Sequence, residues 1–146
     1  MSRRPSILLA MVLLAGCLDF GPKVTTSTPS AKDVARCRAE MYLRSDIEIE
    51  PQGFQLVSGI DASIWFKFIA RTEKIAAVFN EKHVDTSQFS EGYKSHSDSS
   101  LPAWWDAADK KLTGGQVELP NGRFMDVGFS KNEDRTLTVY VMWFET

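Results

Sequence analysis

The sequence predicts an α+β domain in which an antiparallel sheet of about five strands carries helices packed on one face. Three patterns support this fold class. Residues 31–43 place apolar side chains at helical spacing, and residues 54–70 alternate between apolar and polar positions. Residues 116–145 contain three further strand-like runs (116–119, 123–130 and 136–145), and Asn121-Gly122 joins the first two. The predicted order of elements is therefore α-β-β-α-α-β-β-β.

The first predicted element is the helix over residues 31–43. Ser30 precedes it and is a favourable N-cap residue. The apolar positions that recur on one face of this helix are Val34, Cys37 and Met41. Isoleucine and glutamate alternate over residues 47–50 until Pro51, which indicates a short edge strand or an extended lead-in.

Two alternating strands are predicted at residues 54–58 and 64–70, separated by a turn. The second strand has one entirely apolar face and one mixed face, on which Trp65 stands between polar neighbours. The apolar face is formed by Ile64, Phe66, Phe68 and Ala70. A short helix is then predicted over residues 72–79, followed by a long polar stretch, residues 83–100.

The last third of the chain predicts one more helix and three strands. Pro102 opens a helix over residues 101–112, and Gly114-Gly115 is expected to end it. Asn121-Gly122 is a strong hairpin signal, because both turn residues tolerate a positive φ. Residues 136–145 are apolar on both faces, which is typical of a strand in the middle of a sheet.

Length and charge limit the functions that this chain can have. A chain of 146 residues is long enough for one domain. The formal net charge is −2, and without Arg3 and Arg4 it is −4, since 15 basic residues then face 19 acidic ones. An acidic domain is poorly suited to nucleic acid and to electrostatic docking on anionic lipid. No nucleic-acid partner is therefore predicted.

The N-terminal residues have the pattern of an export signal. Two arginines precede an unbroken apolar run, residues 7–15, which is too short to span a bilayer. The run ends in Leu14-Ala15-Gly16-Cys17, which resembles the lipobox of bacterial lipoprotein precursors. This resemblance covers the first 17 residues alone, and no family is recognised for the rest of the chain.

The resemblance implies cleavage by signal peptidase II before Cys17 and acylation of the Cys17 thiol. It divides the chain into a signal peptide (1–16), a lipidated cysteine with a flexible linker (17–30), and one α+β domain (31–146). Fully extended, the linker spans about 40 Å. The absence of aspartate directly after Cys17 favours the outer membrane over the inner, with the domain facing the periplasm or the exterior. Cys37 remains unpaired, either as a buried apolar residue or as a reactive thiol.

Few groups of residues in the sequence could bind a metal or catalyse a reaction. His83-x-Asp85 and His96-x-Asp98 provide two imidazoles and two carboxylates, ligands that zinc or a non-haem metal accepts. The alternative is a solvated polar loop, in which histidine and aspartate are common. Ser95-His96-Ser97-Asp98 contains the residue types of a hydrolase triad, but triads converge from separate elements rather than from neighbours in sequence.

Tryptophan offers the other candidate site. Trp104 and Trp105 are adjacent, so on a helix they point about 100° apart and cannot both face one core. Trp104 is therefore a candidate partner-binding residue, and Trp65 is a second; the alternative is that packing covers both.

Two functions are consistent with these patterns. The preferred one is a lipid-anchored cell-envelope protein that binds another protein or a cell-wall ligand, including an inhibitor role, without catalysis or a cofactor. The alternative is a small metal-dependent envelope hydrolase that uses His83, Asp85, His96 and Asp98.

Overall fold

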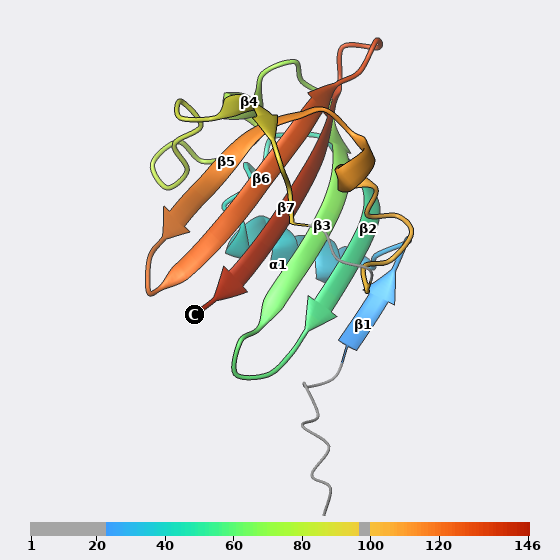
Figure 1. The fold of residues 1–146 in the computed structure, drawn as a ribbon, viewed down its shortest axis with the longest axis vertical. Helices are drawn as coiled ribbons and strands as arrows, with labels where there is room; N and C mark the ends of the chain where they lie inside the picture. Colours follow the sequence, from blue (N-terminus) through green and yellow to red (C-terminus); the bar gives the residue numbers. More distant parts are fainter. Residues whose placement is uncertain (1–22, 97–99) are drawn as a thin grey trace, which may run out of the picture.

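The computed structural model describes residues 23–96 and 100–146. Over these ranges seven antiparallel strands form one sheet in the order β1-β2-β3-β7-β6-β5-β4 (Figure 1). The described elements also include one α-helix and two short 3-10 helices. In chain order they are β1 (Lys23–Thr26), α1 (Ala31–Glu40), β2 (Ile49–Val57), β3 (Ser63–Ala70), η1 (Ile75–Ala77), β4 (Ser90–Tyr93), η2 (Ala107–Asp109), β5 (Leu112–Leu119), β6 (Arg123–Lys131) and β7 (Leu137–Glu145).

The predicted α+β class is wrong, because the domain is predominantly β. α1 forms where the first helix was expected, but the expected helices at 72–79 and 101–112 contain only η1 and η2. In the second segment the apolar spacing serves to cover the sheet rather than to build a helix. Trp105 and Ala107 are buried, Ala108 is exposed, and Leu112 already begins β5.

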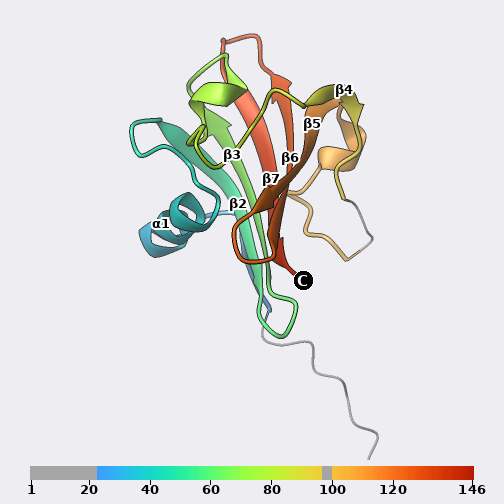
Figure 2. The same ribbon diagram turned by 90° about the vertical axis from the view of Figure 1, so that its left-hand side faces the viewer.

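One face of the sheet packs against α1 and the segment that follows β3, as Figure 2 shows. A capping box starts α1: the Asp33 backbone N–H donates to the Ser30 hydroxyl, and the Asp33 carboxylate accepts from the Ser30 backbone N–H. Cys37 and Met41 then reach the sheet and are fully buried. The predicted apolar face of β3 is confirmed, since all four of its residues are buried in this core.

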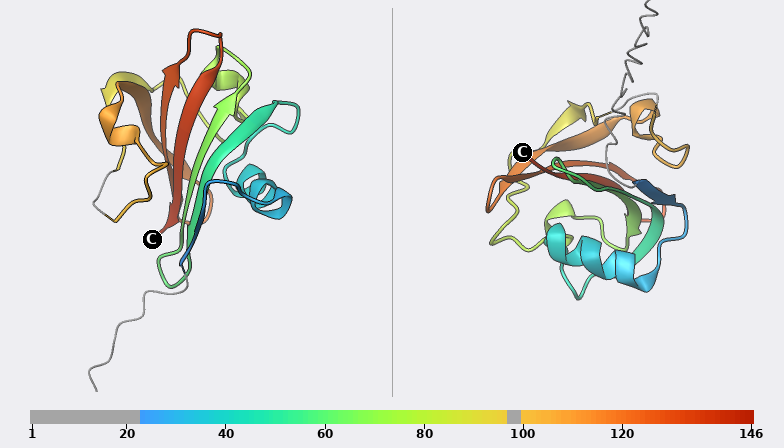
Figure 3. Two further views of the ribbon diagram at one scale, coloured as in Figure 1. Left: turned by 90° about the vertical axis from the view of Figure 1, so that its right-hand side faces the viewer. Right: turned by 90° about the horizontal axis from the view of Figure 1, so that it is seen from below.

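The opposite face of the sheet is also covered. A segment between β4 and β5, which we call the covering segment (residues 94–96 and 100–111), crosses this face (Figure 3). Trp65, Tyr140 and Trp105 form a second apolar cluster beneath it. The prediction that residues 136–145 form a strand buried on both faces is therefore confirmed, because β7 contributes to both clusters.

Both edge strands lie where the sequence predicts no strand. β1 falls within the expected linker and pairs with β2 from Lys23↔Val57 to Thr26↔Phe54, so the folded domain includes residues well before Ser30. β4 lies in the long polar stretch and pairs with β5. β2 continues through Pro51 by a shift of register between Pro51 and Gly53.

The hairpin between β5 and β6 is confirmed. The turn between Leu119 and Arg123 has three residues, and its Asn121 and Gly122 have φ angles of 65° and 69°, the left-handed conformation that asparagine and glycine tolerate. No helix in the described ranges is long and apolar enough to cross a membrane.

Gly114 and Gly115, expected to end a helix, lie instead inside β5. A Cβ atom at Gly114 would overlap the backbone carbonyl oxygen of Val127 on β6. A Cβ atom at Gly115 would lie 3.0 Å from a ring carbon of Phe89, a side chain that can shift.

The two adjacent glycines therefore give a matched test of the sheet. We expect Gly114→Ala to lower the free energy of unfolding by about 3 kcal/mol, because the backbone of β6 must move. Gly115→Ala is expected to cost about 1 kcal/mol or less, because only a ring must move. Urea denaturation measures both values, and equal losses would contradict the position of Gly114 against β6.

Candidate functional site

The two histidines of the predicted metal site lie on opposite faces of the sheet. The His83 ring stacks on Tyr42 with 4.4 Å between centroids, and Tyr42 packs on the core beneath α1. The His96 ring lies 5.5 Å from that of Trp65, in the cluster under the covering segment. The sheet therefore separates the two imidazoles that the metal hypothesis requires together.

The carboxylates do not restore that site. Asp85 is exposed, and its pKa is lowered by hydrogen bonds from Ser87, whose backbone N–H donates to it at 2.9 Å. Asp98 and Cys17 lie outside the described residues. Within the described ranges no three histidine, cysteine or acidic side chains are grouped to hold a metal ion.

The tryptophans proposed to bind a partner are packing residues in the structure. Trp65 is 5% exposed, and its ring meets Trp105 edge-on at 5.0 Å. Trp104 packs on Gly53 of β2 so closely that a Cβ atom at Gly53 would overlap its ring. Its indole Nε1 is buried and has no hydrogen-bond acceptor among the described residues. The rings of Trp65, Trp104 and Trp105 therefore all lie in the packing between the covering segment and the sheet.

Cys37 has the packing role that its place on α1 predicts. Its side chain is fully buried. Burial, with a smaller contribution from the charge of Asp33, raises the pKa of the thiol to about 12. The thiol therefore stays protonated and unreactive at neutral pH.

The covering segment is fastened to the sheet by an anchoring cluster of Lys67, Asp106 and Tyr140. One oxygen of the Asp106 carboxylate accepts from Lys67 Nζ at 2.8 Å and from the Tyr140 hydroxyl at 2.7 Å. Partial burial opposes ionisation of Asp106, but these two hydrogen bonds and the Lys67 charge outweigh it and lower the carboxyl pKa. Burial and the same hydrogen bond raise the pKa of Tyr140.

The anchoring cluster borders a small cavity of about 170 Å³. Polar side chains from β2, β6 and β7 also line it, among them Gln52, Ser130 and Thr138. Lys67 and Tyr140 both donate to Asp106, so the three groups satisfy one another instead of facing a ligand. The cluster is therefore suited to holding the covering segment rather than to chemistry.

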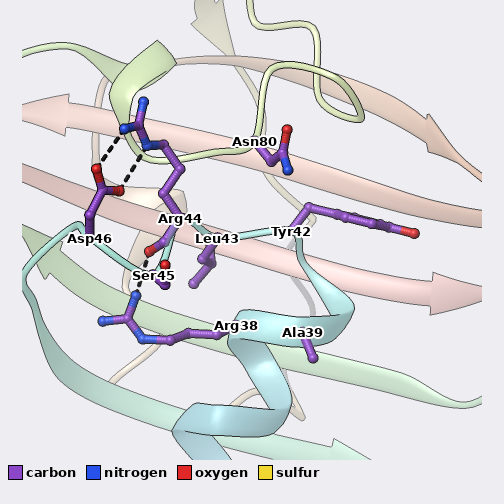
Figure 4. Close-up of a pocket in the computed structure, with 8 residues that line it drawn as sticks. All are labelled: Arg38, Ala39, Tyr42, Leu43, Arg44, Ser45, Asp46 and Asn80. Atoms are coloured by element: carbon purple, nitrogen blue, oxygen red, sulfur yellow. Dashed lines mark hydrogen bonds and ion pairs between the residues drawn. The ribbon is translucent and has the colours of Figure 1, made fainter.

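A second hollow, which we call the α1 groove, lies at the C-terminal end of α1 (Figure 4). Its volume is about 560 Å³. It is lined by Arg38, Ala39, Tyr42, Leu43, Arg44, Ser45, Asp46 and Asn80. The groove is open to solvent, and most of its polar side chains are exposed.

The end of α1 sets the shape of this groove. Tyr42 follows the C-cap with a φ of 53°, and the backbone N–H of Leu43 donates to the carbonyl of Arg38. This is the helix ending that glycine usually makes, here adopted by tyrosine at a conformational cost of about 1 kcal/mol. Asn80 N–H then donates to the Tyr42 carbonyl, and Arg44 N–H donates to that of Val78, so two chain segments form the floor.

The side chains divide the groove into a charged end and an aromatic end. Arg44 binds Asp46 through two hydrogen bonds of 2.9 and 2.6 Å, and Figure 4 shows this pair away from the Tyr42 ring. Arg38 donates to the backbone carbonyls of Arg44 and Ile47 and braces the turn. At the aromatic end, Tyr42 and His83 present a stacked pair with an exposed imidazole.

Sequence reasoning misses the α1 groove for a physical reason. The helical spacing places Tyr42 inside the first helix, and no glycine or asparagine signals that the helix ends before it. The spacing around His83 indicates only the nearby Asp85 as a neighbour, whereas Tyr42 lies 41 positions earlier in the chain.

No protein-family model, no curated protein and no solved structure matches this chain.

The anchoring cluster predicts a pH-dependent contribution to stability. We expect Asp106→Asn to lower the free energy of unfolding by about 2 kcal/mol at pH 7, because Lys67 and Tyr140 lose a charged acceptor. The Asp106 pKa in the folded state lies below its ordinary value of 3.8, so the carboxylate stabilises the fold above that pH. This contribution is lost as the pH falls through the lowered pKa, so the difference between the two proteins should begin to shrink below about pH 4.

Urea denaturation over a range of pH measures this difference. Asp109→Asn is the control, because Asp109 is exposed and lies three residues further along the covering segment. A difference that stays constant down to pH 2, or an equal loss in the control, would contradict the role of Asp106.

Proposed function

We propose that this protein is a cell-envelope lipoprotein, anchored through acylated Cys17, whose domain binds another protein or a cell-wall ligand without catalysis. The Leu14-Ala15-Gly16-Cys17 pattern supports the anchor. The single observation that supports binding is the Tyr42–His83 stack, which borders an open groove and is held by a strained backbone.

Several properties of the α1 groove suit recognition. Tyrosine and arginine are the side chains most often found at binding hot spots, and both line it. Backbone hydrogen bonds on both sides of the groove fix the Tyr42 conformation before a ligand arrives, which reduces the entropy lost on binding. A backbone strained at an exposed aromatic residue is also typical of functional sites.

The charge of this region favours an acidic ligand. Arg38, Arg44 and Lys82 stand against Asp46 and Glu81, in a chain whose net charge is negative. Because Arg44 already binds Asp46 and Arg38 donates to backbone carbonyls, these side chains contribute positive charge to the groove, and the aromatic face of Tyr42 offers a surface for stacking. An acidic protein surface or a cell-wall polymer with free carboxylates fits this combination.

The metal-dependent hydrolase gains no support, because the sheet lies between His83 and His96. No step is therefore assigned to these residues.

The anchor predicts a defined mature product. Intact mass spectrometry of the protein extracted from native membranes should give a chain that begins at Cys17 and carries diacylglycerol and acyl groups. Cys17→Ser should remove the added mass and release the protein from the membrane fraction. Wild-type protein with an unmodified Cys17 would overturn the anchor.

The α1 groove predicts a contact in living cells. A photo-crosslinking amino acid at exposed Lys82 should form an adduct with a protein, or should move the chain into the insoluble cell-wall fraction. Tyr42→Gly in the same protein is expected to reduce that adduct about tenfold, because glycine keeps the left-handed backbone but removes the ring.

The control places the same crosslinker at His96, on the opposite face of the sheet. Adducts of equal yield from the two positions, or an adduct that Tyr42→Gly leaves unchanged, would show that the α1 groove is not the binding site.

A further inference from the structure

We propose that one end of the sheet rests on the lipid surface, with Ile60 of the β2–β3 turn inserted between the lipids. This end, which we call the proximal end, comprises Lys23, the β2–β3 turn (58–62), the β5–β6 turn (120–122) and the last residues of β7. The inference rests on the proposed anchor at Cys17.

The chain enters the domain at the proximal end. Lys23 is the first residue of β1 and pairs with Val57, directly before the β2–β3 turn. The Glu145 N–H donates to the carbonyl of Ala62 at 3.1 Å, so the end of β7 lies beside the same turn. Figures 1 and 3 show the start of β1 and the β2–β3 turn together at one end of the strands.

Exposed apolar side chains are found at this end. Among the described residues, the large apolar side chains exposed to solvent are Ile60, which is 97% exposed, and Val24, which is 50% exposed. Ile60 lies at the tip of the β2–β3 turn, and Val24 lies on β1 opposite Leu56. A fully exposed isoleucine is unfavourable in water, and placing it in lipid removes that apolar surface from water.

The length of the tether keeps this end near the bilayer. Five residues separate Cys17 from Lys23, and the six steps from one residue to the next span about 20 Å at most. The opposite end of the sheet lies about 25 Å further along the strands. Its β6–β7 turn carries Lys131, Glu133, Asp134 and Arg135, all exposed, and these charged side chains stay in water.

Charge does not drive this contact. Lys23 and Arg123 at the proximal end are offset by Asp61 and Glu145, and the chain as a whole is acidic. Contact through an apolar side chain therefore requires no anionic lipid. The partner surface is an uncharged or zwitterionic bilayer.

A fluorescent probe beside Ile60 tests the contact with the native side chain in place. The acylated full chain with Ser58→Cys is labelled with bimane and reconstituted into phosphatidylcholine vesicles that contain doxyl-labelled lipid. Cys37 does not compete for the label, since its thiol is buried and has a pKa of about 12. We expect the lipid quencher to reduce the emission strongly, and Ile60→Ser to lower the inserted population roughly tenfold.

The matched control carries the probe at Glu133→Cys, in the turn at the opposite end, where quenching should be close to background. Mass spectrometry confirms acylation in each sample. Equal quenching at the two positions in acylated protein, or no effect of Ile60→Ser, would overturn this inference alone. A chain without acyl groups on Cys17 would overturn the anchor and this inference together.

Discussion

The two central strands, β3 and β7, carry large apolar side chains on both faces, and this requires the sheet to be covered twice. Phe66 and Val141 face the core under α1, whereas Trp65 and Tyr140 face the covering segment. A single helix of ten residues cannot cover both faces. The covering segment therefore folds back over the sheet, and its tryptophans cover the face that the predicted fold, with helices on one face alone, leaves open.

Hydrogen bonds hold this irregular cover in place. The covering segment has only one short 3-10 helix of its own, so its position depends on contacts with the sheet. Asp106 supplies the acceptor for Lys67 and Tyr140, and the indole N–H of Trp105 donates to the carbonyl of His96 at 3.2 Å. The Asp106 carboxylate accepts hydrogen bonds from the Lys67 ammonium group and the Tyr140 phenol, so these groups hold the covering segment in place and are not free to act on a ligand.

The sequence predicts local patterns well here and long-range ones poorly. Alternation over β3 and β6, the run of β7 that is apolar on both faces, and the Asn121-Gly122 turn are local signals, and the structure confirms them. The edge strands β1 and β4 are four residues long and largely exposed, so they carry no alternation to detect. The Gly114-Gly115 pair is consistent with either the end of a helix or a close approach between two strands. The position of β6 next to Gly114 shows that the second is correct. The Tyr42–His83 stack joins residues 41 positions apart, which no spacing rule predicts.

The proposed anchor and the proposed binding site place different demands on the same sheet. If the proximal end rests on lipid, the strands stand away from the bilayer, and both covered faces of the sheet point sideways. The α1 groove belongs to the face under α1 rather than to the proximal end, so lipid contact leaves it open to a partner. A tether of five residues then helps recognition, because it limits tumbling and presents the Tyr42–His83 pair at a restricted height above the membrane. A longer tether would relax this restriction without altering the groove. Because β1 takes residues 23–26 out of the expected linker, the tether is shorter than the sequence predicts, and this shortening affects how the domain meets its ligand.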